Sequence, residues 1–191
     1  MSLRLTREDI NTTQRAAAAA LEVNGMDYYL FGGAACMYYG NTRIPNDIDV
    51  VVATHRGVEE IKRSIALIDS KECKVDILKP GILDIPETSY VVSTTGVHLM
   101  PPTPLLLMKL KGWEDHRLSR RIDFRAKVPT DASDIVELLA IIQGSQYRTT
   151  ITSNEDGLSY TFLRRSKDRV RDFVLSYPST RNRWQVLGFD V

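Results

Sequence analysis

The feature that most restricts the fold of this chain is a pair of glycines between a short apolar segment and a short helical one. Residues 28–31 are aromatic or aliphatic and end at Gly32 and Gly33, which indicates a buried strand followed by a tight turn. Residues 34–39 have the composition of a short helix, which the glycine at position 40 closes. Because glycine has no side chain, a phosphate group can approach backbone N–H groups at the start of such a helix. Gly32 and Gly33 are therefore candidate phosphate-binding residues.

Two carboxylates open the next predicted strand, which covers residues 48–53. Asp47 and Asp49 are two positions apart, and side chains with this spacing point to the same face of a strand. With Cα atoms roughly 6.6 Å apart, the two charges repel by on the order of 2–4 kcal/mol at an effective dielectric constant near 20. A hard divalent cation offsets this repulsion, and Mg²⁺ suits a site that also holds phosphates. The pair is therefore a candidate metal site, with Mn²⁺ as the alternative ion.

A third acidic residue, Asp76, interrupts an apolar strand predicted at residues 74–78. If this strand neighbours the strand that carries the first two carboxylates, at a spacing of about 4.8 Å, Asp76 can join the same cluster. Three carboxylates on adjacent strands are sufficient to hold two metal ions for phosphoryl transfer. Asp47, Asp49 and Asp76 are therefore the predicted catalytic and metal-binding residues.

The rest of the pattern predicts a small sheet followed by helices. A hairpin is expected around residues 95–96, and prolines after residue 100 end the sheet region. The predicted fold class is α+β, with α/β-like features: a small mixed sheet flanked by helices, and a helical C-terminal part. We expect a catalytic core at residues 1–102 and a helical region at 103–191 that packs on it. A first helix is expected between its N-cap, Thr6, and Gly25. Further helices are expected at 57–68, 105–117, 132–142 (capped by Thr130 or Asp131) and 166–175.

Composition restricts the class of protein further. The 191 residues are 43% hydrophobic, which is enough for a well-packed core, and the formal net charge of +1 does not favour a strongly basic nucleic-acid-binding protein. No apolar run approaches the ~18 residues of a membrane span, and the N-terminus has no signal-peptide pattern. We therefore expect a cytoplasmic protein that does not contact a membrane. Cys36 and Cys73 fit no zinc or redox motif; we expect reduced core residues, with a disulfide as the alternative.

Basic side chains gather in two stretches that can follow a nucleic-acid backbone, with a solvated surface as the competing interpretation. The first stretch contains Arg117, Arg120, Arg121, Arg125 and Lys127, and the second contains Arg164, Arg165, Lys167, Arg169 and Arg171.

The three histidines, at positions 55, 98 and 116, show no metal-ligand spacing.

The combined pattern resembles the DNA-polymerase-β-like nucleotidyltransferase superfamily. The segments that carry the resemblance are GGAACMYYGNTRIPNDIDVVV, LLLMKLKGWEDHR and KVPTDASDI, and they are most similar to the branch of AbiEii-type toxins and minimal nucleotidyltransferases. The resemblance implies a Mg²⁺-dependent enzyme that transfers a nucleoside monophosphate from a nucleoside triphosphate to an acceptor hydroxyl. It implies that Asp47 and Asp49 bind metal ions, and that Asp76 binds metal and helps to deprotonate the acceptor.

Further roles follow from the same resemblance. Lys109 stands where the family has a lysine near the triphosphate. Lys127, with Asp131 and Asp134 after it, is similar to a later motif that supports the substrate or the wall of the site. From its position before the acidic strand, Arg43 is a candidate clamp for phosphate at the rim of the site.

The sequence leaves the acceptor open. It can be an RNA such as the 3′ end of a tRNA, a protein hydroxyl or a small molecule such as an aminoglycoside, and the basic stretches favour RNA. Two other functions compete with transfer. One is a catalytically inactive module of the same fold that binds a nucleotide or a partner, and the other is a metal-dependent hydrolase or nuclease that uses the same carboxylates.

Overall fold

The computed structural model describes residues 5–65, 73–86, 91–94, 96–145 and 157–191. Its strands are β1 (Asp27–Phe31), β2 (Asp47–Ala53), β3 (Lys74–Leu78), β4 (Val92–Thr94) and β5 (Val97–Leu99). Its helices are α1 (Arg7–Val23), α2 (Gly32–Tyr39), α3 (Val58–Ile65), α4 (Pro102–Leu118), α5 (Ile122–Arg125), α6 (Val128–Gly144), α7 (Tyr160–Ser176) and α8 (Arg181–Val186), with short 3₁₀ turns η1 (Ile82–Asp84) and η2 (Pro178–Thr180).

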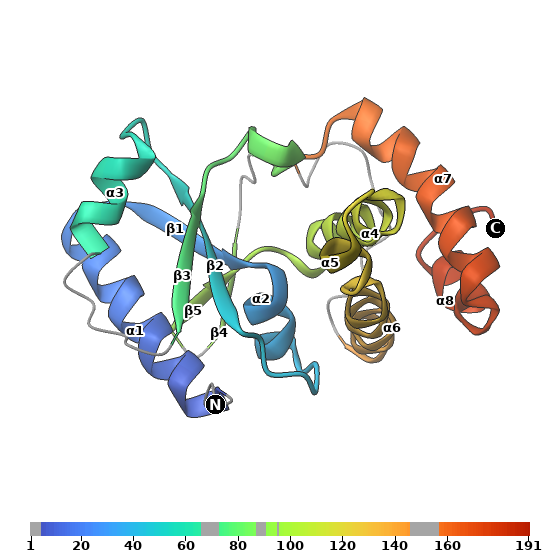
Figure 1. The fold of residues 1–191 in the computed structure, drawn as a ribbon, viewed down its shortest axis with the longest axis horizontal. Coiled ribbons are helices and arrows are strands. Elements are labelled where there is room, and N and C mark those ends of the chain that lie inside the picture. Colours follow the sequence, from blue (N-terminus) through green and yellow to red (C-terminus); the bar gives the residue numbers. More distant parts are fainter. Residues whose placement is uncertain (1–4, 66–72, 87–90, 95, 146–156) are drawn as a thin grey trace.

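The five strands form one mixed sheet in the order β3-β2-β1-β5-β4. β2 lies antiparallel to β1 and parallel to β3, while β5 lies parallel to β1 and antiparallel to β4. In Figure 1, α1 and α3 lie on one side of this sheet and α2 lies on the other. The arrangement confirms the predicted α+β class, with a small mixed sheet flanked by helices.

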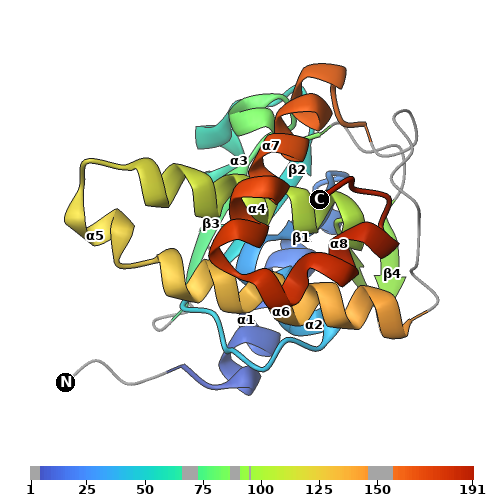
Figure 2. The same cartoon turned by 90° about the vertical axis from the view of Figure 1, so that its right-hand side faces the viewer.

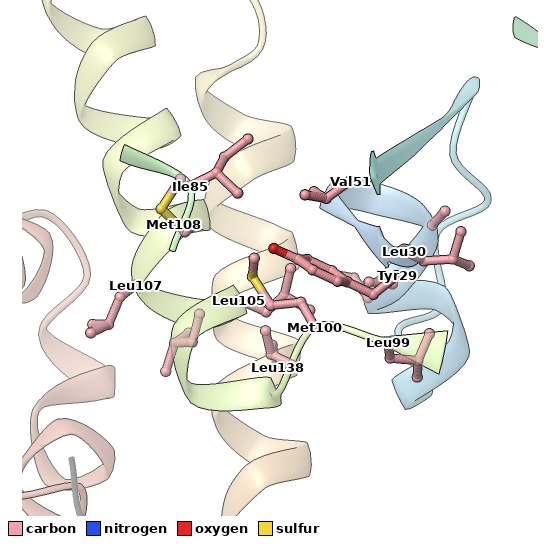
Figure 3. Packing of buried hydrophobic residues seen from close by; sticks show 14 of the residues in the cluster. Tyr29, Leu30, Val51, Ile85, Leu99, Met100, Leu105, Leu107, Met108 and Leu138 are labelled. Carbon is pink, nitrogen blue, oxygen red and sulfur yellow. The ribbon is translucent and has the colours of Figure 1, made fainter. Parts of the chain in front are cut away.

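The helical part is organised around α4, which contacts α2, α5, α6 and α7 (Figure 2). Its residues Leu105, Leu106, Leu107 and Leu110 are fully buried, because helices surround α4 on several sides. A single apolar cluster joins the sheet to these helices, and Figure 3 shows Leu30 and Leu99 of the sheet, together with Leu105 of α4, among its members. The functional division of the chain after residue 102 stays a prediction.

Prolines explain why two of the observed helices begin earlier than expected. α4 begins at Pro102 and α6 at Val128, each earlier than expected, because proline at the first helical positions gives up no hydrogen bond. The prediction that Thr130 or Asp131 caps α6 is therefore wrong: both lie within the helix, and Lys127 is its N-cap. α7 also starts earlier, after Ser159, and α5 and α8 were not predicted. Residues 66–68 of one expected helix, and residues 90 and 95 of the expected hairpin, lie outside the described residues.

Three smaller expectations can be compared with the structure. The Thr6 N-cap is confirmed: its hydroxyl accepts a hydrogen bond from the backbone N–H of Asp9, whose carboxylate in turn accepts one from Thr6. Cys36 and Cys73 are buried and are not joined in a disulfide, so the alternative of a disulfide is wrong. Within the described ranges, none of the helices combines the length and the apolar character that crossing a bilayer requires.

Candidate functional site at the edge of the sheet

The strand directions bring three sequence-distant segments together at one end of the sheet. Because β1 runs antiparallel to β2, its last residue, Phe31, pairs with Asp49, and the first residue of α2, Gly32, follows directly. Because β3 runs parallel to β2, Asp76 pairs with the same Asp49. Asp47 is two positions earlier on β2 and shares the face of Asp49. The predicted convergence of the three carboxylates on one face of the sheet is therefore observed.

On this face of the sheet, burial and neighbouring negative charges disfavour the ionised form of Asp49. Burial, followed by the charges of Asp47 and Asp76, raises the pKa of Asp49 to about 6, although Lys109 and Lys74 act in the opposite direction. A cation bound nearby would stabilise the ionised form of this carboxyl group and lower its pKa. Asp47 and Asp49 thus fit a hard divalent cation by their oxygen chemistry and by the repulsion between their negative charges.

The two glycines make room for side chains of the site itself. Gly32 has a φ of +60°, and a Cβ atom there would lie 2.1 Å from Oδ2 of Asp49. A Cβ atom on Gly33 would lie 2.9 Å from Nη2 of Arg43 and 3.1 Å from Cβ of Pro45. This close packing is a reason for the glycines that sequence reasoning did not supply, and their contact with phosphate stays a prediction.

Gly32 offers a direct test of this packing. Gly32→Ala should lower the free energy of unfolding by about 1–3 kcal/mol through its left-handed backbone alone, and further by displacing the carboxylate of Asp49. Gly25→Ala is the matched control, since Gly25 has a φ of +64° and its added Cβ atom would meet nothing within 4 Å. Urea unfolding of both variants measures the difference, and equal losses would contradict the close approach of Asp49 to Gly32.

A cavity of about 470 Å³ opens between this end of the sheet and the helices α4 and α6. Of the residues that the sequence singled out, those that line the cavity are Gly32, Gly33, Arg43, Asp47, Asp49, Lys109, Lys127 and Asp131. Asp76 and Asp134 are not part of the lining. Most of the predicted site residues therefore face one shared space, although they come from four separate segments of the chain.

Asp76 differs from the other two carboxylates because it forms an ion pair with a lysine of its own strand. Nζ of Lys74 lies 2.6 Å from Oδ1 and 2.8 Å from Oδ2 of Asp76. Within the described residues, no group of three or more His, Cys, Asp and Glu side chains is placed to hold a metal ion. Asp47 and Asp49 are therefore the residues that fit a cation directly, and a metal-binding role for Asp76 stays a prediction.

At the opposite wall of the cavity, a buried aspartate binds two positively charged side chains. Asp134 on α6 accepts hydrogen bonds from Nε and Nη2 of Arg43, at 2.9 and 2.6 Å, and its Oδ2 lies 2.8 Å from Nζ of Lys109. Burial alone would raise the pKa of Asp134, but the hydrogen bond from Arg43 and the charge of Lys109 outweigh it and keep that pKa below its ordinary value. Asp134 thus positions two positive groups at the cavity, although it does not line the cavity itself.

The loop between α2 and β2 is fastened to α6 by further hydrogen bonds. The side-chain amide of Asn41 donates to the backbone carbonyl of Asp134 at 3.0 Å. The backbone N–H and the hydroxyl of Thr42 donate to the carboxylate of Glu137, at 2.7 and 2.9 Å. These contacts fix the helical wall relative to the carboxylates on β2.

Sequence reasoning missed several cavity residues on α4 and η1. Lys111, Gly112 and His116 line the cavity from α4, and Leu83 lines it from η1 with a left-handed φ of 56°. A detectable signal existed for two of them. Lys109, Gly112 and His116 are spaced so that they share one face of a helix.

Within the described residues, four of the ten basic side chains of the two stretches form ion pairs with nearby carboxylates. Arg121 pairs with Asp123, Arg117 with Asp172, Arg169 with Glu114 and Arg171 with Asp168, and Lys127 lies over the ring of Phe124. Local pairing reduces the positive field that these stretches offer to a nucleic-acid backbone. It weakens the preference for an RNA acceptor that the sequence suggested.

One solved structure has a fold similar to that of this chain. No protein-family model matches the chain, and no curated protein matches it. The crystal structure of an antigenic nucleotidyltransferase-like protein from Paracoccidioides brasiliensis is similar to this chain, with a TM-score of 0.66 over 98% of this chain and 95% of that chain, at 16% identity. The chain therefore has a nucleotidyltransferase-like fold, while its placement in the AbiEii-type branch stays a prediction.

Proposed function

We propose that this protein transfers a nucleoside monophosphate from a nucleoside triphosphate to an acceptor hydroxyl. The observation that carries the proposal is the carboxylate pair of Asp47 and Asp49, which repel each other in a cavity faced by Lys109 and Arg43. Negative and positive walls across one cavity suit a triphosphate chelated by divalent cations. The nucleotidyltransferase-like fold supports the same reaction class at a coarse level.

Each site residue that the sequence predicted has a role in this proposal. Asp47 and Asp49 would hold Mg²⁺ or Mn²⁺, and Asp76 would complete a two-metal site once Lys74 releases it. The ions would neutralise charge on the phosphates during transfer. Positive side chains at the opposite wall, Arg43 and Lys109, would orient the phosphates, helped at the rim by Lys127. Asp131 and Asp134 would support that wall, and Gly32 and Gly33 would admit the nucleotide to the start of α2.

The finer identity of the enzyme belongs to the same proposal. We place it with the AbiEii-type toxins and minimal nucleotidyltransferases on the motifs around Asp47 and Lys127, and we expect it to work in the cytoplasm. The acceptor would be an RNA such as tRNA, a protein or a small molecule. The ion pairs within the basic stretches weaken the preference for an RNA acceptor without removing it.

A second candidate, a module that binds nucleotide without transferring it, is favoured by one observation. Lys74 contacts both carboxylate oxygens of Asp76, so the third predicted metal ligand is already satisfied within the protein. If that ion pair persists when nucleotide binds, the site would retain two carboxylates for cations. Such a site can still recognise a chelated triphosphate, because recognition needs fewer fixed groups than transfer does.

One experiment separates the two candidates. The protein is incubated with Mg²⁺, cell extract and each nucleoside triphosphate labelled at the α-phosphate, and the labelled products are identified. Transfer predicts a labelled acceptor together with released pyrophosphate, whereas a hydrolase would give labelled free nucleotide. A rise in melting temperature with Mg²⁺ and nucleotide, without any labelled product, would favour the binding module. If no triphosphate gives a labelled product or a thermal shift, both candidates are contradicted.

A further inference from the structure

We infer that His116, held by Asp131, takes the proton from the acceptor hydroxyl in the proposed transfer reaction. The inference rests on the proposed function and adds a catalytic residue to it. His116 lies on α4 and lines the same cavity as Asp47 and Asp49. Its side chain is 19% exposed, so it is largely enclosed by protein while one part of it meets the cavity.

The imidazole ring of His116 is fixed on two sides. Nδ1 lies 2.5 Å from Oδ2 of Asp131 on α6, and the ring packs edge-on against Phe124 of α5, with centroids 5.3 Å apart. A carboxylate accepts hydrogen bonds, so Nδ1 carries a hydrogen, and the tautomer of the ring that acts as a base has its lone pair on Nε2. Within the described ranges, Nε2 has no protein hydrogen-bond partner. The arrangement is that of a general base held in one tautomer by a carboxylate.

Access to this nitrogen is left open by a glycine one turn earlier on α4. Gly112 lines the cavity, and a Cβ atom placed on it would meet nothing within 4 Å. A glycine inside a helix is destabilising by about 1 kcal/mol relative to alanine, and no close packing requires one here. The missing side chain exposes the backbone of α4 between Lys109 and His116, where a substrate can approach the imidazole.

The residue that the sequence suggested for this proton transfer is less well placed. Lys74 engages both carboxylate oxygens of Asp76, and Asp76 does not line the cavity. Asp47 and Asp49 are the groups that fit cations, and a carboxylate that binds a cation is a weaker base. Among the described cavity residues, His116 combines a fixed ring, a free nitrogen and a neighbouring carboxylate that stabilises the imidazolium ion.

The step balances without another reagent. The acceptor oxygen forms a bond to the α-phosphorus as its proton moves to Nε2 of His116. The bond from the α-phosphorus to the oxygen that bridges to the β-phosphate breaks, and pyrophosphate leaves with the electron pair. Asp131 stabilises the imidazolium ion, which then gives its proton to solvent and restores the neutral ring.

His116→Gln tests the inference, because glutamine can still donate a hydrogen bond to Asp131 but cannot take up a proton near neutral pH. The transfer rate from α-labelled nucleoside triphosphate to the acceptor should fall about 100-fold or more, while the affinity for the nucleotide stays close to wild type. His55→Gln is the matched control, since His55 is exposed and does not line the cavity. It should transfer at the wild-type rate.

A second variant leaves the histidine in place. Gly112→Leu keeps His116 and Asp131 intact, adds a good helix former and covers the approach to the ring, so transfer should fall without loss of thermal stability. Wild-type transfer by either His116→Gln or Gly112→Leu would overturn the inference. So would a loss of nucleotide affinity in proportion to the rate, which would assign the His116–Asp131 pair to bracing α4 against α6. Absence of transfer by the wild-type protein would overturn the proposed function first, and this inference with it.

Discussion

Asp49→Asn should abolish nucleotidyl transfer and, in the absence of divalent cations, should make the protein more stable than wild type. Asparagine keeps the size of the side chain beside Gly32 but removes the charge that attracts the cations. Losing several kcal/mol of transition-state stabilisation corresponds to a rate at least ~1,000-fold lower. The rate is measured by label transfer from the α-labelled nucleotide, and the stability by urea unfolding in the presence of a chelator.

The sign of the stability change follows from the pKa of Asp49. Burial and the neighbouring carboxylates raise that pKa to about 6, above the value of 3.8 for a free aspartate, so the folded state disfavours the ionised form. This penalty is complete above pH 6, where both states are ionised, and it disappears as the pH falls below the unfolded-state value. The stability gain of Asp49→Asn should therefore be about 1–3 kcal/mol at neutral pH and should shrink through the window between the two values.

Asp27→Asn is the matched control for Asp49. Asp27 is an exposed aspartate on the neighbouring strand β1, at the opposite end of the strand from the cavity. Its replacement should leave the transfer rate at the wild-type value. An Asp49→Asn protein that transfers label at the wild-type rate would remove the basis for the proposed function, whatever its stability.

The sequence predicted the strands of the site and the faces of their side chains well, because both follow from strand periodicity. The alternation in β2 placed Asp47 and Asp49 on one face, and the apolar run around Asp76 identified β3 as a strand. Both features are local, because the side chains of a strand alternate irrespective of its partners. The register that pairs Asp49 with Asp76 comes from the structure, because the sequence left open whether the two strands are neighbours.

Contacts between elements were the part that the sequence did not predict. The ion pair of Lys74 with Asp76 is an exception, because the two residues are two positions apart on β3 and share a face, yet sequence reasoning did not consider it. His116 was interpreted as an ordinary residue because it has no metal-ligand spacing, whereas its partner Asp131 lies on another helix. Tertiary proximity of this kind becomes visible only when α4 and α6 are packed together.

The buried aspartate beneath the cavity gives the largest expected effect on stability. Asp134→Ala leaves the guanidinium of Arg43 and the ammonium of Lys109 without their shared partner, and Lys109 is largely buried. Removing one side of a buried ion pair typically costs about 3–5 kcal/mol, because the remaining charge stays desolvated and unpaired. We expect a loss of that size in urea unfolding at pH 7, together with weaker nucleotide binding as Arg43 and Lys109 lose their fixed positions.

A surface ion pair provides the comparison for this effect. Asp172→Ala removes the partner of Arg117 in a half-exposed pair, and its cost should be below about 1 kcal/mol. The pKa of Asp134 is lowered in the folded state, so its contribution is present above the unfolded-state value and is lost as the pH falls through the lower folded value. The difference between Asp134→Ala and wild type should therefore be constant near neutral pH and narrow only in acid below about pH 4. Equal costs for the two variants at pH 7 would show that the Arg43–Asp134–Lys109 cluster is not the buried anchor of the cavity wall.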